Sequence, residues 1–544
     1  QEKCYISGMS GVVTDIKNLA MGEMPIYVMI AVVLSLIVLG LTMESFLVPL
    51  IFLLSIGIAI VYNMGTNSFL GDISYLTQAL AAVLQLGVTL DYSIFLLNNY
   101  EENKQRFEGD KERAMSHAIA NTFKSVVGSS ITTIAGFAAL CFMTFRLGLN
   151  IGVVMMKGVA IGVVCCVTLL PAMVLLFDKA IEKTRHKPLI PSLDKISHFV
   201  TKHYKVWMAI FLALFIPALY GNNHNKVYYN IDKSLPDTLE SAVANEKLSN
   251  RFHLSNVYML LLENGIDAKD KQEMIEQVKE VDGVKWCIGM SSVVGSGVPE
   301  EMIPEELSKM LQGENYEVEF VASDFASATD EQNEQIRQVD RIVKGFNKNS
   351  MVIGEAPLMK DLSDVSSTDT RNVNIASIAA IFVIIMLVFK SVSLPFLLVL
   401  VIEFAIFVNM AIPCYAGTEL PFVASIVIGT VQLGSTVDYA ILMTSKYQRE
   451  RSRGAGKKEA IRRAHCSSMK SILVSGISFF AATFGVGLYS EIDMVSALCI
   501  LLSRGAVIST IVVICILPAM FMAFDKVICK TSIGFLPKEQ KAAG

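Results

Sequence analysis

The feature that most restricts this 544-residue chain is a series of eleven apolar runs, most of them long enough to cross a lipid bilayer. A helix needs about 20 apolar residues to cross the hydrocarbon core, and only helices or closed barrels satisfy their backbone hydrogen bonds there. Hydrophobic residues make up 53% of the chain and charged residues only 18%, which excludes an ordinary soluble domain. The chain is therefore predicted to be a polytopic α-helical membrane protein with spans near residues 26–43, 46–62, 76–98, 126–143, 151–177, 206–220, 375–389, 394–412, 422–443, 472–488 and 494–524.

Lysine and arginine residues are concentrated in alternate loops. Residues 178–205 carry seven of them and residues 444–465 carry eight, whereas the loops at 63–75 and 413–421 carry none. Because positively charged loops stay on the cytoplasmic side of a membrane, the basic segments and the C-terminus are predicted to be cytoplasmic. The polar segment of about 150 residues between the sixth and seventh spans is then predicted to lie outside the plasma (inner) membrane.

The second half of the chain repeats the first at a constant spacing. Asp91 and Asp438 are 347 residues apart, and so are Pro171 and Pro518 in the similar stretches LLPAM and ILPAM. This offset pairs every span except the sixth, whose counterpart would precede residue 1. We therefore expect a complete protein of twelve spans in two pseudo-symmetric halves. This chain is expected to lack the first span and most of the first outer domain.

The spans and the repeat together predict a domain plan. It comprises a remnant of the first extracytoplasmic domain (1–24), a five-span bundle (25–178), a cytoplasmic linker (179–205), the first span of the second half (206–221), an extracytoplasmic domain (222–371), a second five-span bundle (372–527) and a cytoplasmic tail (528–544). Within 222–371, strands are predicted near 257–262, 284–290, 316–322 and 350–356, and helices near 267–281, 331–346 and 300–311. Apart from the last helix, the order β-α-β-β-α-β is that of a ferredoxin-like α/β domain.

The third and ninth spans each contain an aspartate within an apolar run. The stretches QLGVTLDYSIFLLNNY (85–100) and QLGSTVDYAILMTSKY (432–447) agree at eight of sixteen positions. An ionised aspartate at mid-span costs roughly 2.5 to 3.5 kcal/mol on insertion scales, so it usually faces the bundle interior and marks an ion or proton path. Burial disfavours the charged form of a carboxyl group. Asp91 and Asp438 are therefore suited to load and unload protons.

A tyrosine, Tyr92 or Tyr439, follows each aspartate about 100° further round the helix, so the two side chains cannot face the same neighbour. Each phenol can instead bond to the carboxylate of the other half. The alternative interpretation, a buried aspartate that only holds helices together, remains open. The duplication of the surrounding residues favours the proton relay.

Several neighbouring residues are candidates to support the relay. Gly87 and Gly434, four residues before each aspartate, let another helix approach closely. Gln85 and Gln432 are expected either to pack helices or to hydrate the path. Hydroxyl groups that could bond to the relay residues are expected in the next spans, although such groups more often bond to their own helix. The candidates are Ser129, Ser130, Thr133, Ser475 and Ser478.

The duplicated GxxxDY motif (87–92 and 434–439), six-span halves and large outer domains together resemble the resistance-nodulation-division (RND) superfamily, most closely its MmpL (MMPL) branch. The stretch GSSITTIAGFAAL (128–140) is also similar to that branch. The resemblance implies proton-motive-force-driven export of lipids or amphiphilic, hydrophobic compounds. It also implies that Asp91, Tyr92, Asp438 and Tyr439 form the proton relay and that the outer domains form the substrate route.

Two other functions stay open: a SecDF-like proton-driven motor for protein export, and a lipid- or sterol-sensing membrane scaffold that transports nothing. Neither repeat has the Asp-Ala-Asn and Phe-Glu-Arg sequences of the SecDF group. Enzymatic activity and a cofactor are not expected, since no nucleophile-base pair or metal-ligand set appears in the sequence. A metal site is not expected, since the ten cysteines lack metal-binding spacing. A net charge of −4 gives no reason to expect nucleic acid as a partner. Protons, membrane lipids and a lipid or amphiphilic substrate are the expected partners, and the choice between a monomer and a homo-oligomer such as a trimer stays open.

Overall fold

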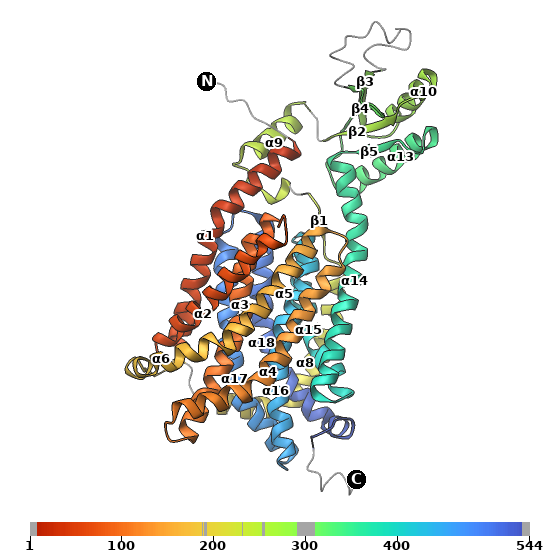
Figure 1. The fold of residues 1–544 in the computed structure, drawn as a ribbon. Helices are drawn as coiled ribbons and strands as arrows, with labels where there is room; N and C mark the ends of the chain where they lie inside the picture. Colours follow the sequence, from red (N-terminus) through yellow and green to blue (C-terminus); the bar gives the residue numbers. More distant parts are fainter. Residues whose placement is uncertain are drawn as a thin grey trace. The chain divides into compact units, whose positions relative to one another are not determined.

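A computed structural model of the chain describes residues 8–187, 189, 193–230, 232–252, 256–290 and 311–535 (Figure 1). The chain divides into two compact units. One consists of Gln1–Asn18 and Tyr228–Thr368, and the other of Leu19–Val227 and Asp369–Gly544. We call them the α/β unit and the helix bundle.

Long apolar helices make up the helix bundle. Within the described part of the chain, eleven helices are long and apolar enough to span a membrane, as the sequence predicts. The bundle helices are α1 (Met9–Thr42), α2 (Leu47–Gly65), α3 (Tyr75–Arg106), α4 (Lys111–Ala139), α5 (Arg146–Val167), α6 (Leu169–Lys183), α7 (Asp194–Lys202), α8 (Tyr204–Asn223), α14 (Glu355–Phe389), α15 (Ser393–Ala416), α16 (Phe422–Ser452), α17 (Lys457–Tyr489) and α18 (Asp493–Thr531). Helices α5 and α6 together form one of the eleven spans, and the short helix α7 is not one of them. The short 3-10 helices η1 (Thr66–Phe69) and η2 (Leu140–Phe142) follow α2 and α4, and the two-residue strand β6 (Leu420–Pro421) precedes α16.

The 347-residue offset holds in the structure. Adding 347 to the residue numbers matches α3 to α16, α4 to α17, and α5 with α6 to α18, and the helix boundaries agree to within a few residues. The halves differ at Thr168, where the chain breaks between α5 and α6, whereas α18 is continuous through the corresponding position. Eleven spans in two repeated halves are therefore present within the described residues.

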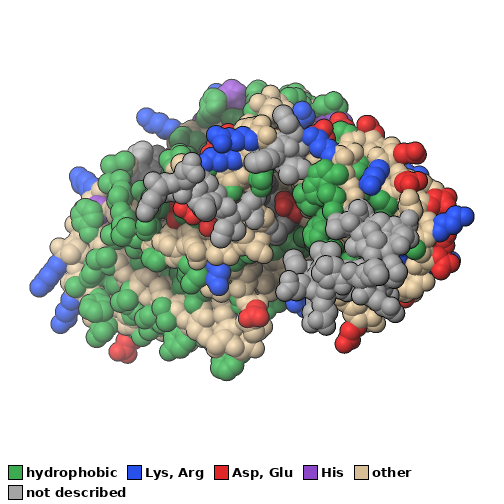
Figure 2. All heavy atoms as spheres, turned by 90° about the horizontal axis from the view of Figure 1, so that it is seen from above, with side chains coloured by type: hydrophobic (Ala, Val, Ile, Leu, Met, Phe, Trp, Pro, Cys, Tyr) green, Lys and Arg blue, Asp and Glu red, His purple; other side chains and the backbone are tan. Residues whose placement is uncertain are grey.

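Burial separates the central helices from the outer ones. In the most apolar stretch of α3 every residue is buried, and in that of α16 89% of the residues are buried. In the most apolar stretch of α8 only 17% of the residues are buried. Exposed apolar side chains such as Leu212 and Ile216 lie on α8. Figure 2 shows hydrophobic side chains, drawn in green, exposed on the face of the molecule that it presents. A polar residue in the most apolar stretch of α3 or α16 is therefore enclosed by protein. Most residues of α8 are not enclosed in this way.

A four-stranded sheet forms the α/β unit. Its elements are β2 (Asn256–Glu263), α10 (Ala268–Lys279), β3 (Val284–Gly289), β4 (Tyr316–Ser323), α13 (Asp330–Phe346) and β5 (Met351–Ile353), preceded by β1 (Val227–Tyr228), η3 (Asp232–Ser234) and α9 (Glu240–Phe252). The strand order is β3-β4-β2-β5, and all neighbours are antiparallel. These elements follow the predicted β-α-β-β-α-β order. The further helix predicted near residues 300–311 lies, except for Leu311, outside the described residues.

Alternating burial along β2 forms the core of this unit. Tyr258, Leu260 and Leu262 point inward at every second position. They pack on Val278 of α10 and Val339 of α13. The two helices therefore cover the same apolar face of the sheet.

Candidate proton relay in the helix bundle

The two aspartates singled out by the sequence lie on the central helices. Asp91 on α3 is 4% exposed and Asp438 on α16 is 1% exposed. The structure thus brings together one acidic side chain from each half in the interior of the bundle.

Ser475 of α17 connects Asp91 to the tyrosine of the other half. Its hydroxyl is hydrogen-bonded to Oδ1 of Asp91 and lies 2.9 Å from the hydroxyl oxygen of Tyr439. Asp91 and Ser475 are 384 residues apart in the chain. The first half supplies the acid, and the second half supplies both hydroxyl groups.

Thr133 of α4 takes the same place in the other cluster. Its Oγ1 lies 3.4 Å from Oδ2 of Asp438 and 3.5 Å from the hydroxyl oxygen of Tyr92. Its strongest bond is donated to the backbone carbonyl of Gly434, at 3.0 Å. Oδ1 of Asp438 accepts no hydrogen bond from any described residue. This second cluster is therefore looser than the first.

The expected direct bond between each tyrosine and the opposite carboxylate is not observed. In both clusters a serine or threonine hydroxyl lies between the phenol and the carboxylate. A hydroxyl group both donates and accepts. Ser475 can therefore pass a proton between the acid and the phenol of opposite halves, and Thr133 can do so when its hydroxyl turns from the carbonyl of Gly434 to Asp438.

Glycines allow these helices to come close. A Cβ atom on Gly87 would lie 2.5 Å from Cδ2 of Phe479 on α17, too short for an unchanged structure. On the other side, Gly136 of α4 faces the backbone of α16, and its Cβ would lie 3.3 Å from Cα of Gly434. Gly87 and Gly434 thus lie where α17 and α4, the helices that carry the bridging hydroxyls, pack against α3 and α16.

The glutamines of the repeat bind neighbouring helices. Gln85 accepts from Asn63 Nδ2 at 2.8 Å and donates to the carbonyl of Gly158 at 3.0 Å. In the other half, Gln432 accepts from Asn409 Nδ2 at 2.8 Å and donates to Ser509 Oγ at 3.0 Å. These contacts favour helix packing over hydration of the path as the role of Gln85 and Gln432.

The remaining predicted hydroxyls are not part of the bridges. Ser130 donates to the carbonyl of Val127 on its own helix, at 3.1 Å. The hydroxyls of Ser129 and Ser478 are buried, and neither bonds to a described residue. Of the five candidates, Thr133 and Ser475 are hydrogen-bonded to an aspartate, and Ser129 lies beside Asp438 without a bond of its own.

Two positively charged side chains within the spans were not predicted as functional residues from the sequence. Lys157 of α5 donates to Asn67 Oδ1 at 2.6 Å, and Arg504 of α18 donates to Asn409 Oδ1 at 2.8 Å. They are 347 residues apart, so the repeat that identified the aspartates could also have identified them. Each is held by an asparagine side chain, and Asn409, the partner of Arg504, also binds Gln432.

A duplicated ion cluster near the basic ends of α3 and α16 was also missed. Asp178 accepts from Tyr100 at 2.8 Å and pairs with Lys104 at 2.8 Å. In the second half, Asp525 bonds to Tyr447 and accepts from Arg451 at 3.3 Å. All three positions of this cluster obey the 347-residue offset, and each cluster stays within its own half.

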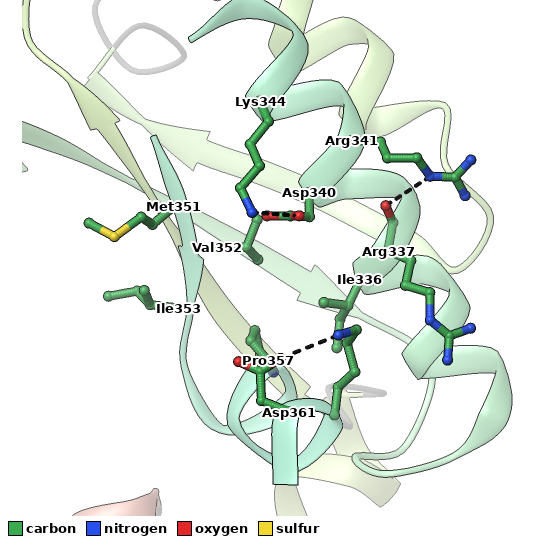
Figure 3. A pocket seen from close by; sticks show the side chains of 11 residues that line it. Ile336, Arg337, Asp340, Arg341, Lys344, Met351, Val352, Ile353, Pro357 and Asp361 are labelled. Atoms are coloured by element: carbon green, nitrogen blue, oxygen red, sulfur yellow. Dashed lines mark hydrogen bonds and ion pairs between the residues drawn. The ribbon is translucent and has the colours of Figure 1, made fainter. Parts of the chain in front are cut away.

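A cavity of about 640 Å³ in the α/β unit is a second candidate ligand site. It is lined by α13, β5 and the start of α14 (Figure 3). Its cationic side chains already face acidic ones: Lys344 lies 2.9 Å from Asp340 (Figure 3). Lys360 lies 3.3 Å from Asp361. Because these pairs balance the charge, nothing in the cavity selects a class of ligand, and the buried carboxylates are the stronger candidate site.

Comparison with known proteins agrees with the motif. A profile of the MMPL family matches residues 2–207 and 233–531. The chain belongs to the MMPL family. MMPL proteins with similar sequences include the membrane protein ActII-3 of Streptomyces coelicolor, which is 22% identical over 84% of this chain and 62% of its own length. The chain therefore spans less than two thirds of that relative.

Two other relatives have names that state what they export. The sulfolipid-1 exporter MmpL8 of Mycobacterium tuberculosis is 23% identical over 50% of this chain and 25% of its own length. The apo-petrobactin exporter of Bacillus anthracis is 21% identical over 91% of this chain and 70% of its own length. MMPL proteins are transporters rather than enzymes, and the eleven apolar helices of this member make it a multi-pass membrane protein.

Proposed function

We propose that this chain belongs to an exporter of lipids or amphiphilic compounds that is driven by the proton-motive force. The observation that carries the proposal is the pair of buried aspartates, each joined through a hydroxyl to the tyrosine of the other half. Asp91, Tyr92, Asp438 and Tyr439 form the proton relay, and Ser475 and Thr133 bridge its members. The exporter names of the two relatives support the direction of transport and an amphiphilic substrate.

Protonation supplies the driving force. One charge that crosses 100 mV is worth ~2.3 kcal/mol, enough to shift a conformational equilibrium about fiftyfold. When a proton neutralises Asp91 or Asp438, the bonds to Ser475 or Thr133 weaken, because neutral hydrogen bonds are weaker than charge-assisted ones. The helices that meet at these bridges can then repack.

The orientation of the chain follows from its charge. The basic segments 178–205 and 444–465 lie in the cytoplasm together with the C-terminus, and the α/β unit lies outside the membrane. We assign the first five spans to helices α1 to α6 and the last five to helices α14 to α18. With this orientation, protons that enter from outside and leave to the cytoplasm drive substrate outward.

The proposal is tested by Asp91→Asn and Asp438→Asn in the full-length protein, reconstituted in liposomes with an imposed pH gradient. Flux of Nile red and of nitrobenzoxadiazole-labelled phosphatidylethanolamine is measured. Each variant is expected to lose gradient-driven flux while reaching the membrane in normal amount. Asp72→Asn, at an exposed loop position, serves as the matched control. Normal flux in either relay variant would contradict the proposal.

A further inference from the structure

Two more carboxylates lie buried in the bundle, on the helices that are shared with the α/β unit. Glu23 lies on α1 and is 6% exposed, and Asp369 lies on α14 and is 1% exposed. The sequence plan assigned both to outer domains, but α1 and α14 each run without interruption across the boundary between the two units. A buried carboxylate is costly unless it is hydrogen-bonded, so the partners of these two side chains are informative.

Asp369 holds the outer end of α4, a helix of the other half. Its Oδ2 accepts from the backbone N–H of Thr144 at 2.9 Å and of Phe145 at 3.3 Å, and its Oδ1 accepts from Thr144 Oγ1 at 2.9 Å. These residues join α4 to α5. The carboxylate thus satisfies backbone donors at the N-terminus of α5, where the helix dipole favours a negative charge.

Glu23 makes the corresponding contact on the opposite side. It accepts from the backbone N–H of Glu491 at 3.2 Å and from Ser490 Oγ at 3.5 Å. Tyr27, one turn further along α1, bonds to Glu23 and lies 2.7 Å from Ser490 Oγ. The contacted residues join α17 to α18 and match the Thr144 segment within one residue under the 347-residue offset. Both carboxylates therefore bind across the two halves.

The same two helices, α17 and α4, carry the bridging hydroxyls of the relay. On α17, Ser475 binds Asp91, and Ser490 at its end binds Glu23. The two serines are 15 residues apart, or about 22 Å along a helix that rises 1.5 Å per residue. Both of their carboxylate partners come from the first half.

In the mirror arrangement, Thr133 of α4 binds Asp438, and Thr144 just beyond α4 binds Asp369. Here both carboxylate partners come from the second half. Each connecting helix is therefore held within its length by a relay acid and at or just beyond its outer end by a carboxylate of the helix that leads to an outer domain.

We infer that Glu23 and Asp369 are positioning residues that couple the relay to the outer domains, with α17 and α4 as the connecting helices. Protonation of Asp438 loosens Thr133, and the resulting movement of α4 reaches α14 through Asp369. Protonation of Asp91 acts in the same way on α1, through α17 and Glu23. The inference rests on the proposed proton relay, since it assigns a route to the signal that the relay produces.

Hydrogen exchange of the full-length protein in nanodiscs tests this route without any substrate. Asp438→Asn imitates the protonated relay, and it should change exchange in residues 355–368 of α14 by about twofold to thirtyfold, the range that coupling energies of this kind span. In an Asp369→Ala background the response should disappear. In an Asp369→Asn background it should persist, because an amide can accept from both N–H groups and donate to Thr144.

Glu23→Ala is the matched control, since it breaks the other connection and should leave the response of α14 to Asp438→Asn intact. A response that survives Asp369→Ala, or a protein without any response, would overturn the inference. General loss of protection in α16 of the Asp369→Ala variant would overturn it as well, because a structural role would then explain the effect. Failure of the proposed function would appear instead as normal flux in the Asp91→Asn or Asp438→Asn proteins.

Discussion

The two relay clusters have the same acid and the same phenol but different bridges. Ser475 binds both Asp91 and Tyr439 closely, whereas Thr133 lies 3.4 Å from Asp438 and 3.5 Å from Tyr92. The reason is visible in the repeat. Under the 347-residue offset Ser475 corresponds to Gly128, and Thr133 corresponds to Phe480. The Asp-Tyr pairs are duplicated, but each half obtained its hydroxyl at a different position of the equivalent helix.

This difference indicates that the two acids are not interchangeable. Because one has a close hydroxyl partner and the other has an oxygen without a described partner, we expect the halves to bind protons in sequence rather than together.

Among the bridging residues and the glycines, the largest effect is expected for Ser475→Ala. Loss of a hydrogen bond to a charged group costs about 1.5 to 3 kcal/mol, so gradient-driven flux should fall by roughly tenfold to a hundredfold. Ser478→Ala is the matched control, because its buried hydroxyl on the same helix bonds to no described residue. That variant should stay within about twofold of the parent protein. Equal losses in the two variants would remove the distinction between a bridge and a packed hydroxyl.

An intermediate effect is expected on stability when the glycines are changed. Gly87→Ala should lower the free energy of unfolding by about 1 to 3 kcal/mol, because its Cβ would meet the ring of Phe479 at 2.5 Å. Gly434→Ala should cost little, since its Cβ meets Thr133 at an ordinary 3.5 Å. Thermal unfolding in detergent measures both, and Phe479→Leu should rescue Gly87→Ala. A larger loss in Gly434→Ala would mean that the two glycine contacts have been ranked wrongly.

The smallest effect on flux is expected for Thr133→Ala. Its bonds to Asp438 and Tyr92 are long, and bonds weaken with distance, so flux should fall by only about threefold. Thr133→Ser keeps the hydroxyl and should behave like the parent protein. If Thr133→Ala lost as much flux as Ser475→Ala, the asymmetry between the clusters would have no functional meaning.

The sequence alone was sufficient to predict the features that depend on repeated patterns along the chain. Apolar runs predicted the eleven spans, and alternation predicted the order of strands and helices in the α/β unit. The 347-residue offset predicted which helices correspond. These features depend on local hydrophobicity and on duplication, both of which can be read without knowledge of contacts.

The bridges and the outer carboxylates could not be predicted in the same way. Ser475 and Thr133 break the repeat, so no pattern distinguishes them from Ser129, Ser130 or Ser478. Glu23 and Asp369 bind partners in the other half, which are 468 and 225 residues away from them in the sequence. Such pairs form only after the two halves assemble.

The central claim is that protons pass through the paired aspartates and drive flux of the transported molecule. It is tested most directly by recording proton entry and Nile red flux together in liposomes that contain the full-length Asp91→Asn/Asp438→Asn protein. The account predicts that a pH gradient drives neither proton entry nor dye flux above that of empty liposomes, while the parent protein shows both. Coupled movement of protons and dye in the double variant would contradict it.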